Sequence, residues 1–502
     1  MTTCRGRNLR DNVHERRNDA LKLGEIDIVY FCFFDFGRPL SMEEIHEYLN
    51  KRNKDLNLDL RIDLEKPKAY YTFSKHYRSY HMPLVVRGLV KHIFRQQKFN
   101  LEELRAEIEN LVNELPGFNL ILDFTRDAWE KIERERKEIS MEITKFEIRI
   151  SLTGVISVRI WLRISGPKLP TTSLITLMNT YCREYARGIS TYTVRMLFEG
   201  LKEWSEPADY YCVLLIGESE PEYNDVSVLK KEHGKELIGL SFSSWLWPRY
   251  NRELVEARLK NDLSYTTREI QLIEWRNTLI FSPDLKVAKE EPKMPAPYFK
   301  YISDLLLALE LLLMQKMVLE RCDELLDDEL RRAAEILEKA LTTESLSALR
   351  LYVRSLEKEL FVLRRLEVEV VDALEIERGV IIDHFKSFVK AAKEELGLSD
   401  LLLSVSNKIR RLEDIENAVY EAMSRMIRRR IEDAMRLLAA ASFGVAGIEL
   451  ISMMLTVPTW SYLPIFVAFM ILGYKIVGIA ERVRVFIRWL SKLLTRRRRA
   501  GG

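Results

Sequence analysis

A single carboxylate, Glu449, lies in the middle of a long apolar stretch near the C-terminus. The stretch covers residues 437–457 (LLAAASFGVAGIELISMMLTV), and its 21 residues would form a helix of about 31 Å. A charge at that depth in a bilayer is costly, so it should face protein or water rather than lipid. At about 100° per residue, Ser442, Glu449 and Thr456 fall within about 40° of one another. In an oligomer, this face predicts a ring that attracts cations.

Two apolar residues extend the same face toward the start of the stretch. Met435 and Leu438 lie near the helical line of Glu449 and predict an apolar constriction. The predicted pore-lining residues are therefore Met435, Leu438, Ser442, Glu449 and Thr456, with Glu449 as the candidate metal ligand. A second interpretation stays open, in which Glu449 is protonated and forms a hydrogen bond between helices.

A second apolar stretch follows almost immediately. Residues 460–480 (WSYLPIFVAFMILGYKIVGIA) again number 21, and only Pro458 and Thr459 separate the two stretches. Both match the hydrocarbon thickness of a bilayer, and proline beside aromatic residues suits a turn at the membrane interface. We therefore predict a two-helix transmembrane hairpin, with a buried hairpin in a soluble core as the alternative. Lys475 lies at a different depth from Glu449 and should extend to the cytoplasmic face.

Basic residues flank this hairpin on both sides. No lysine or arginine lies in its turn, whereas five arginines precede it: Arg425, Arg428, Arg429, Arg430 and Arg436. The positive-inside rule then places both ends in the cytoplasm, as in a two-pass plasma-membrane protein. In the basic tail, four arginines predict contact with anionic lipid headgroups rather than nucleic acid: Arg496, Arg497, Arg498 and Arg499.

Small and acidic residues mark two further features of the helix that enters the membrane. Gly444 and Gly447, together with alanines 439–441, form a surface that permits close packing of a second helix. Three acids before the hairpin either form an acidic collar at the cytoplasmic mouth or are ordinary solvated charges: Glu421, Glu432 and Asp433.

The composition of the 502 residues narrows the classes of function. Charged residues make up 30% of the chain, but the net charge is only +3, which is not typical of nucleic-acid-binding proteins. The five cysteines are scattered without a CxxC pair, which indicates a reducing compartment. Residues 1–22 lack the apolar segment of a signal peptide and predict a disordered polar tail. No P-loop, HExxH, GxSxG or GxGxxG motif lies in a strand–helix context, so we expect neither an enzyme nor a bound cofactor.

The N-terminal half mixes strand and helix signals. Residues 26–36 (IDIVYFCFFDF) predict a buried strand. Ser41 and Glu44 have the spacing of a capping box and predict the start of a helix. Residues 146–164 alternate around Gly154 and predict a β-hairpin. Three further elements complete the expected α/β domain: a helix over residues 171–204 and core strands at 210–217 and 237–242.

After four prolines within residues 282–297, the sequence becomes almost entirely helical in character. Gly397 predicts a break, and the following helix carries an apolar stripe and enters the first apolar stretch without a breaker. The predicted fold is an α+β membrane protein with an N-terminal cytoplasmic α/β domain, a long-helix stalk and a C-terminal two-helix transmembrane hairpin. The expected segments are the polar tail (1–22), the α/β domain (23–290), a helical domain (291–400), the stalk helix (401–436), transmembrane helices (437–457 and 460–480) and the basic cytoplasmic tail (481–502).

This layout resembles the CorA-type magnesium transporters. Residues 432–439 (EDAMRLLA) are similar to the stretch at the cytoplasmic mouth of that family's first span, usually written NEVMKVLT, and four positions match in kind: Asp433, Met435, Arg436 and Leu438. The resemblance implies a homopentamer whose first span lines a pore, with Mg²⁺ or another divalent cation as substrate. Residues 456–458 (Thr-Val-Pro) stand where that family carries Gly-Met-Asn, and its usual acidic external loop is missing.

Three functions are compatible with these features. The first is a CorA-like homo-oligomer that conducts divalent metal cations and senses an ion or ligand with its cytoplasmic domain. The second is a membrane-anchored scaffold or sensor that keeps this architecture without transport. The third is a membrane-tethered enzyme with its site in residues 25–282. The expected partners are membrane lipid and further copies of the chain.

Overall fold

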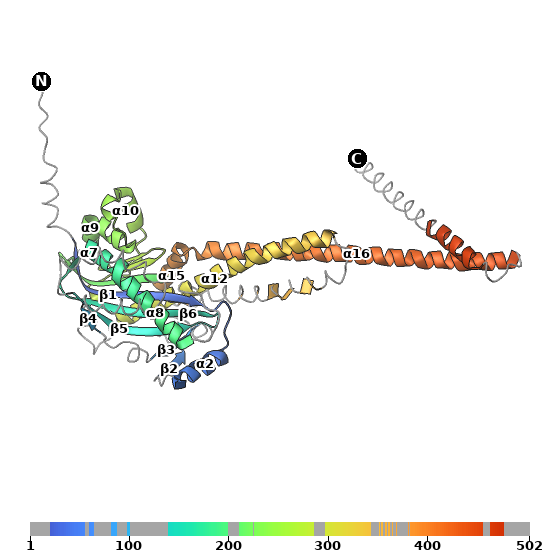
Figure 1. The fold of residues 1–502 in the computed structure, drawn as a ribbon. Coiled ribbons are helices and arrows are strands. Elements are labelled where there is room, and N and C mark those ends of the chain that lie inside the picture. Colours follow the sequence, from blue (N-terminus) through green and yellow to red (C-terminus); the bar gives the residue numbers. More distant parts are fainter. Residues whose placement is uncertain are drawn as a thin grey trace, which may run out of the picture. The chain divides into compact units, whose positions relative to one another are not determined.

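The computed structural model describes residues 21–55, 60–64, 82–87, 98–100, 139–198, 210–223, 225–285, 297–342, 382–454 and 462–475, with scattered positions between 351 and 380. The chain divides into two compact units, Met1–Leu326 with Leu363–Lys408, and Asp327–Val362 with Ile409–Gly502. The first unit contains a mixed β-sheet with helices on both faces, and the described part of the second is helical (Figure 1). Residues 1–20 of the predicted tail lie outside the described residues, whereas Leu21 is buried and Lys22 begins the first strand, so the predicted tail boundary at residue 22 is too late.

Four long strands form the middle of the sheet. They are β1 (Lys22–Asp35), β5 (Ser140–Ile150), β6 (Val155–Ser165) and β8 (Tyr210–Glu220). The strand order is β2-β3-β5-β6-β1-β8-β10-β9; neighbours on this path are antiparallel except β8 and β10. The shorter strands are β2 (Arg61–Leu64), β3 (Leu84–Arg87), β4 (Lys98–Asn100), β7 (Leu169–Pro170), β9 (Ile270–Ile273) and β10 (Asn277–Phe281).

Strand β1 is buried on both faces, which explains its nearly continuous run of apolar residues. Because side chains alternate along a strand, Tyr30 and Phe31 point to opposite faces, and both are at most 1% exposed. Tyr30 belongs to the core under the helices that follow β7, whereas Phe31 lies beneath Arg159 on the other face. The prediction of a buried strand at residues 26–36 is confirmed, except that Phe36 lies just beyond β1.

The two local motifs near the start of the chain have the predicted geometry. Helix α2 (Met42–Asp55) follows a capping box, in which the Glu44 amide donates to the Ser41 hydroxyl and the Ser41 amide donates to the Glu44 carboxylate. The β5–β6 hairpin turns at Gly154, whose φ is +91°. A Cβ at Gly154 would lie 1.9 Å from the Arg38 carbonyl oxygen, so only glycine fits this turn.

Helices cover the Tyr30 face of the sheet. Helix α7 (Thr171–Thr176), the π-helical turn η1 (Leu177–Cys182) and α8 (Arg183–Phe198) follow one another and confirm the predicted helix up to Phe198; residues 199–204 lie outside the described residues. The prediction of a core strand at residues 237–242 is wrong, because residues 237–241 belong to helix α9 (Val226–Ser241). The Asp225 side chain caps α9 at the Ser227 amide, so the helix starts well before the short apolar run that suggested a strand.

Long helices follow the sheet residues. Helix α12 (Pro297–Thr342) has 46 residues, α15 (Asp383–Glu395) has 13, and α16 (Leu398–Met454) has 57. Gly397 separates α15 from α16 with a φ of +68°, so the predicted break is confirmed. The predicted uninterrupted passage from the stalk into the first apolar stretch is also present, because α16 covers the stalk and residues 437–454 of that stretch.

A small apolar core in the second unit holds α16 against the end of α12. Val353 and Val419 form its buried centre, and partly buried side chains pack around them: Ile336, Leu337, Ile415, Tyr420, Met423 and Met426. The first part of the predicted apolar stripe of α16 is therefore buried within the chain itself.

Candidate functional site

The end of α16 packs against a second helix, residues 462–475, through small residues (Figure 1). Ala440 is fully buried on α16. A Cβ at Gly444 would lie 2.7 Å from the Phe466 ring, and one at Gly447 would lie 2.3 Å from the Phe469 ring. Glycine at these positions lets the aromatic rings reach the α16 backbone. The predicted small-residue packing surface is therefore confirmed.

The predicted pore-lining residues lie on the opposite side of α16 from this packing surface. At about 100° per residue, Met435, Leu438, Ser442 and Glu449 are centred roughly 180° from the line of Ala440, Gly444 and Gly447. All four are exposed, with Met435 at 65% and Leu438 at 69%. The second helix thus leaves one continuous face of α16 uncovered, and we name these four residues the open face.

Glu449 has no partner of its own in the described part of the chain. No hydrogen bond or ion pair there involves its carboxylate, and Lys475, on the second helix, is exposed and does not pair with it. The Ser442 hydroxyl donates to the Leu438 carbonyl of its own helix at 3.0 Å. Thr456 and Arg496, Arg497, Arg498 and Arg499 lie outside the described residues.

The three predicted collar acids do not share one face of α16. Glu421 lies 3.9 Å from Arg425, and Asp433 lies 3.3 Å from Arg436, in each case within one helical turn. Helical geometry places Asp433 on the packing side and Glu421 and Glu432 roughly 80–100° from Glu449. Glu421 and Glu432 therefore flank the open face, whereas Asp433 lies away from it.

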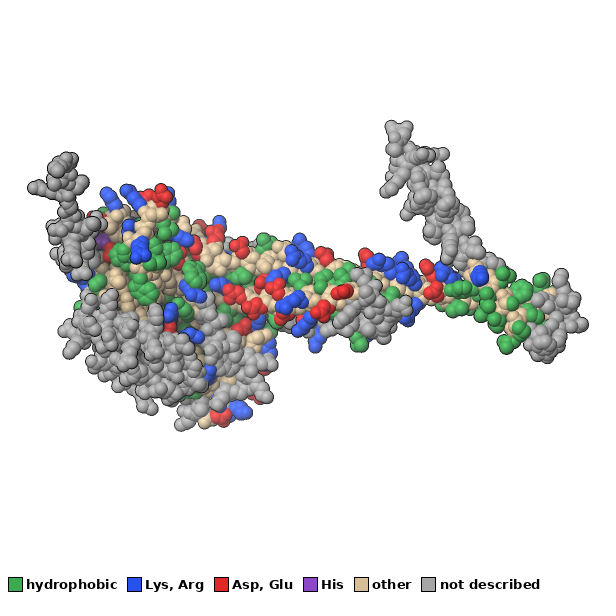
Figure 2. Space-filling model, turned by 45° about the horizontal axis from the view of Figure 1, so that its top comes forward, with side chains coloured by type: hydrophobic (Ala, Val, Ile, Leu, Met, Phe, Trp, Pro, Cys, Tyr) green, Lys and Arg blue, Asp and Glu red, His purple; other side chains and the backbone are tan. Residues whose placement is uncertain are grey.

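Apolar side chains remain exposed on the described parts of both helices, the end of α16 and residues 462–475. Figure 2 shows hydrophobic side chains gathered over the end of α16 and the helix after it. Their exposed fractions range from 40% for Val467 to 85% for Met453, and the set comprises Leu437, Phe443, Val445, Leu450, Met453, Leu463, Val467, Ile471, Leu472 and Tyr474. Soluble monomers rarely expose contiguous apolar patches of this kind without a partner.

Among the residues that the structure describes, no helix has the length and apolar character needed to cross a membrane. The expected spans, 437–457 and 460–480, include positions 455–457, 460–461 and 476–480, which lie outside the described residues.

A buried ionic cluster, which the sequence did not predict, joins α12 to the sheet. Glu310 of α12 is fully buried and pairs with Arg159 of β6; its other partners are Arg149 of β5, at 3.3 Å, and the Ser157 hydroxyl, at 2.5 Å. The Arg159 guanidinium also lies 5.1 Å from the centroid of the Phe31 ring. These groups fix α12 on the Phe31 face of the sheet.

Two further charges extend the cluster along β5. Glu147 lies 2.9 Å from Arg149 and 2.7 Å from Lys145. Burial alone would raise the pKa of Glu147, but the adjacent Arg149 and Lys145 hold it well below its usual range. Burial lowers the pKa of Lys145 to about 8, although the adjacent Glu147 opposes this. The one sequence signal for the cluster was Glu310 itself, an acid within the apolar run LLLALELLLM.

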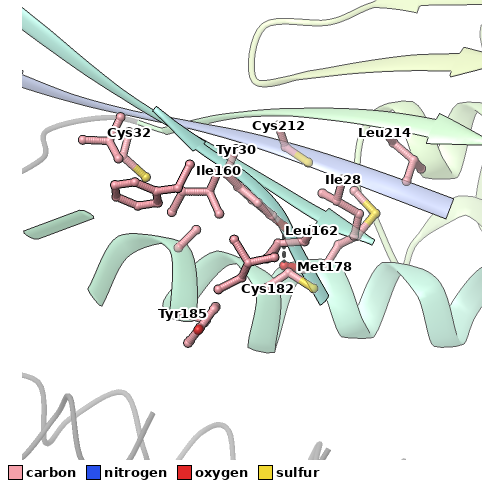
Figure 3. Close-up of a cluster of buried hydrophobic side chains, with 14 of the residues drawn as sticks. Ile28, Tyr30, Cys32, Ile160, Leu162, Met178, Cys182, Tyr185, Cys212 and Leu214 are labelled. Carbon is pink, nitrogen blue, oxygen red and sulfur yellow. Dashed lines mark hydrogen bonds between the residues drawn. The ribbon is translucent and has the colours of Figure 1, made fainter. Parts of the chain in front are cut away.

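The sulfur-containing side chains under α7 and α8 form an apolar core rather than a reactive site (Figure 3). The Tyr30 hydroxyl donates to the Met178 carbonyl of η1 at 2.8 Å, and the Cys182 thiol lies 3.4 Å from the Met141 sulfur. Burial raises the pKa of Cys32 and Cys212 to about 12. In the described part of the chain, no group of three or more His, Cys, Asp or Glu residues could hold a metal ion.

Comparisons with protein-family models, curated proteins and solved structures found no match to this chain.

Proposed function

We propose that the chain is a membrane-embedded homo-oligomer, CorA-like in layout, that conducts divalent metal cations along an axis lined by α16. In this proposal, both termini are cytoplasmic, and the pore-lining residues are those of the open face together with Thr456. The oligomer is proposed to be a pentamer by resemblance to the CorA-type transporters. Mg²⁺ or another divalent cation is the substrate, and no catalytic step is involved.

The observation that carries this proposal is the division of α16 into two opposite faces. One face, with Ala440, Gly444 and Gly447, is filled by the second helix. The other presents the Ser442 hydroxyl, which bonds within its own helix to the Leu438 carbonyl, and the Glu449 carboxylate, which has no hydrogen bond or ion pair in the described part of the chain. Around a symmetry axis, identical copies would bring these polar groups together, while the second helix lies outside the ring.

The exposed apolar side chains support the membrane location. They surround both helices of the hairpin rather than one edge, as is typical of a surface that contacts lipid or neighbouring subunits. The absence of lysine and arginine from residues 455–474, with arginines on both sides, supports the two-pass orientation.

Each residue of the open face has a proposed role. A ring of Glu449 carboxylates would attract cations, and Ser442 would supply hydroxyl groups to a hydrated ion. Met435 and Leu438 would narrow the pore to an apolar constriction that opens and closes by wetting. Glu421 and Glu432 would raise the local cation concentration at the cytoplasmic mouth.

Cysteine accessibility during ion flux tests this arrangement. Ser442→Cys lies on the open face, whereas the control Leu450→Cys lies about 80° away around the helix. We expect a water-soluble, positively charged thiol reagent to block divalent-cation flux into proteoliposomes through Ser442→Cys and not through Leu450→Cys or the wild-type protein.

A monomer or dimer in detergent, or equal block of the two variants, would contradict the proposed pore. Flux no greater than that of empty vesicles would leave a non-transporting scaffold as the better description.

A further inference from the structure

Two carboxylates share one guanidinium where α15 ends. Arg258 of α10 (Arg252–Leu259) lies 3.3 Å from Glu274, in the β9–β10 turn, and 3.4 Å from Glu395, the last residue of α15. Glu274 is only 3% exposed, whereas the Arg258 and Glu395 side chains are about one-third exposed. The position of Arg258 is fixed further by the Phe242 ring, whose centroid is 5.3 Å away. Three separate elements therefore meet at these charges.

This cluster lies directly before the start of α16. The backbone reverses at Gly397, whose amide donates to the Glu394 carbonyl and whose carbonyl accepts from the Leu401 amide. A Cβ at Gly397 would meet nothing within 4 Å, so glycine is required there by the φ of +68° alone. Only Leu396 and Gly397 separate the last turn of α15 from α16, the helix that carries the open face.

Charged and polar groups from three elements, α10, α15 and β8, surround Glu274. Arg258 approaches from α10 and Glu395 from α15, and the Tyr211 hydroxyl of β8 donates to the Glu274 carbonyl oxygen at 2.7 Å. Burial raises the pKa of Glu274 to about 7; Arg258 opposes this effect and Glu395 adds to it. A glutamate in an unfolded chain has a pKa of about 4.3. Between this pH and the folded pKa of about 7, Glu274 therefore binds a proton in the folded chain that it releases on unfolding.

The direction of the pH effect follows. Because the pKa of Glu274 is raised in the folded chain, protonated Glu274 stabilises the fold fully at pH values below its unfolded pKa. This stabilisation is lost as the pH rises to about 7, the pKa of Glu274 in the folded chain. Above this value, Glu274 is charged, repels Glu395 and competes with it for Arg258. Below a pH of about 7, Glu274 is uncharged, and the Arg258 guanidinium forms an ion pair with the Glu395 carboxylate alone.

We propose that Arg258, Glu274 and Glu395 form a proton-operated latch that holds the last turn of α15 at acidic pH and loosens it at alkaline pH. The consequence for conduction rests on the proposed function, because α16 begins immediately after this turn and carries the open face. The latch itself rests on the guanidinium that Glu274 and Glu395 share and on the titration of buried Glu274, and not on conduction.

Hydrogen exchange followed by mass spectrometry tests the latch in the full chain. After correction for the intrinsic rate, residues 389–400 should exchange several-fold faster at pH 8 than at pH 6. Glu274→Gln keeps the side chain uncharged and should show slow exchange at both values. Glu256→Gln is the matched control, since Glu256 pairs with Arg252 on the exposed face of α10, and it should behave like the wild type.

Ion flux measured on the same proteins separates the latch from the pore. A flux that changes between pH 6 and pH 8 in the wild type and not in Glu274→Gln supports both proposals. Exchange that titrates while all proteins lack flux supports the latch and rejects conduction. Exchange that is equal at both pH values in the wild type, or that still titrates in Glu274→Gln, overturns the latch.

Discussion

Buried charges join α12 to the sheet. Glu310 neutralises part of the positive charge of Arg149 and Arg159, and none of the three is more than 1% exposed. A buried ion pair is costly to break, because the remaining partner stays in a poorly solvating environment. Loss of the Glu310 carboxylate would therefore remove a partner from two buried arginines at once.

Glu310→Ala should lower the free energy of unfolding of the sheet domain by about 3–5 kcal/mol, because it leaves two guanidinium groups without their shared carboxylate. Urea denaturation followed by tryptophan fluorescence measures this change. The exposed Arg252–Glu256 pair gives the control, since Glu256→Ala should change stability by less than about 1 kcal/mol. Equal effects of the two substitutions would show that the cluster does not stabilise the domain.

The buried cysteines should resist alkylation. Because burial raises the pKa of Cys32 and Cys212 to about 12, only about one thiol in 10⁴ is ionised at pH 8, and solvent does not reach either sulfur. Iodoacetamide should therefore modify them in urea but not in the native protein, as peptide mass spectrometry would show. Rapid native labelling of either thiol would contradict the structure.

At the residue scale, the sequence predicted short-range features better than long-range ones. The capping box of Ser41 and Glu44 depends on two residues three positions apart, so its spacing is visible in the chain. The pairing of Arg159 with Glu310 joins residues 151 positions apart, and nothing in either neighbourhood specifies the partner. The acid within the apolar run of α12 was the available signal that a buried charge needed a counterion.

At the scale of elements, α16 combines three environments along one uninterrupted helix. Its first residues pack in the sheet domain, where the Lys408 ammonium lies 2.9 Å from Asp323 of α12. Its middle packs against Val353, and its end packs against residues 462–475. The 3.6-residue periodicity predicted this helix because each environment keeps one apolar or small-residue face.

Gly447→Val should weaken the helix pair at the end of α16. The added Cβ would lie 2.3 Å from the Phe469 ring, and overpacking of this kind costs about 1–3 kcal/mol. Ala446→Val is the matched control, because Ala446 is exposed on the same helix. Thermal unfolding in detergent should show a lower midpoint for Gly447→Val alone. Equal midpoints would argue against close packing at Gly447.

The incorrect strand at residues 237–242 shows where periodicity fails. A run of six residues, LIGLSF, is too short to separate a strand from a buried helix. Two features favour the helix: Asp225 caps α9 well before the run, and Gly239, within the run, allows the Trp247 side chain to pack against the helix. Strands β9 and β10 were not predicted individually, because four and five residues give too little pattern.

At the scale of the whole molecule, the central proposal is conduction of divalent cations by a ring of α16 helices. Thr456-Val457-Pro458 stands where the CorA-type transporters carry their signature, so under this proposal ion selection would depend on other groups. Glu449 is the carboxylate of the open face and the candidate for that role. Under this proposal, the sheet domain would act on the pore through the start of α16.

Divalent-cation flux into proteoliposomes, compared between the wild type, Glu449→Gln and Glu449→Ala, tests this proposal most directly. Glu449→Gln keeps the size and hydrogen-bonding capacity of the side chain but removes its charge. We expect flux in the wild type and a loss of about ten-fold or more in both variants, since a charge that attracts a cation in a narrow pore is worth more than about 1.4 kcal/mol. Wild-type flux equal to that of empty vesicles, or full flux in both variants, would contradict it.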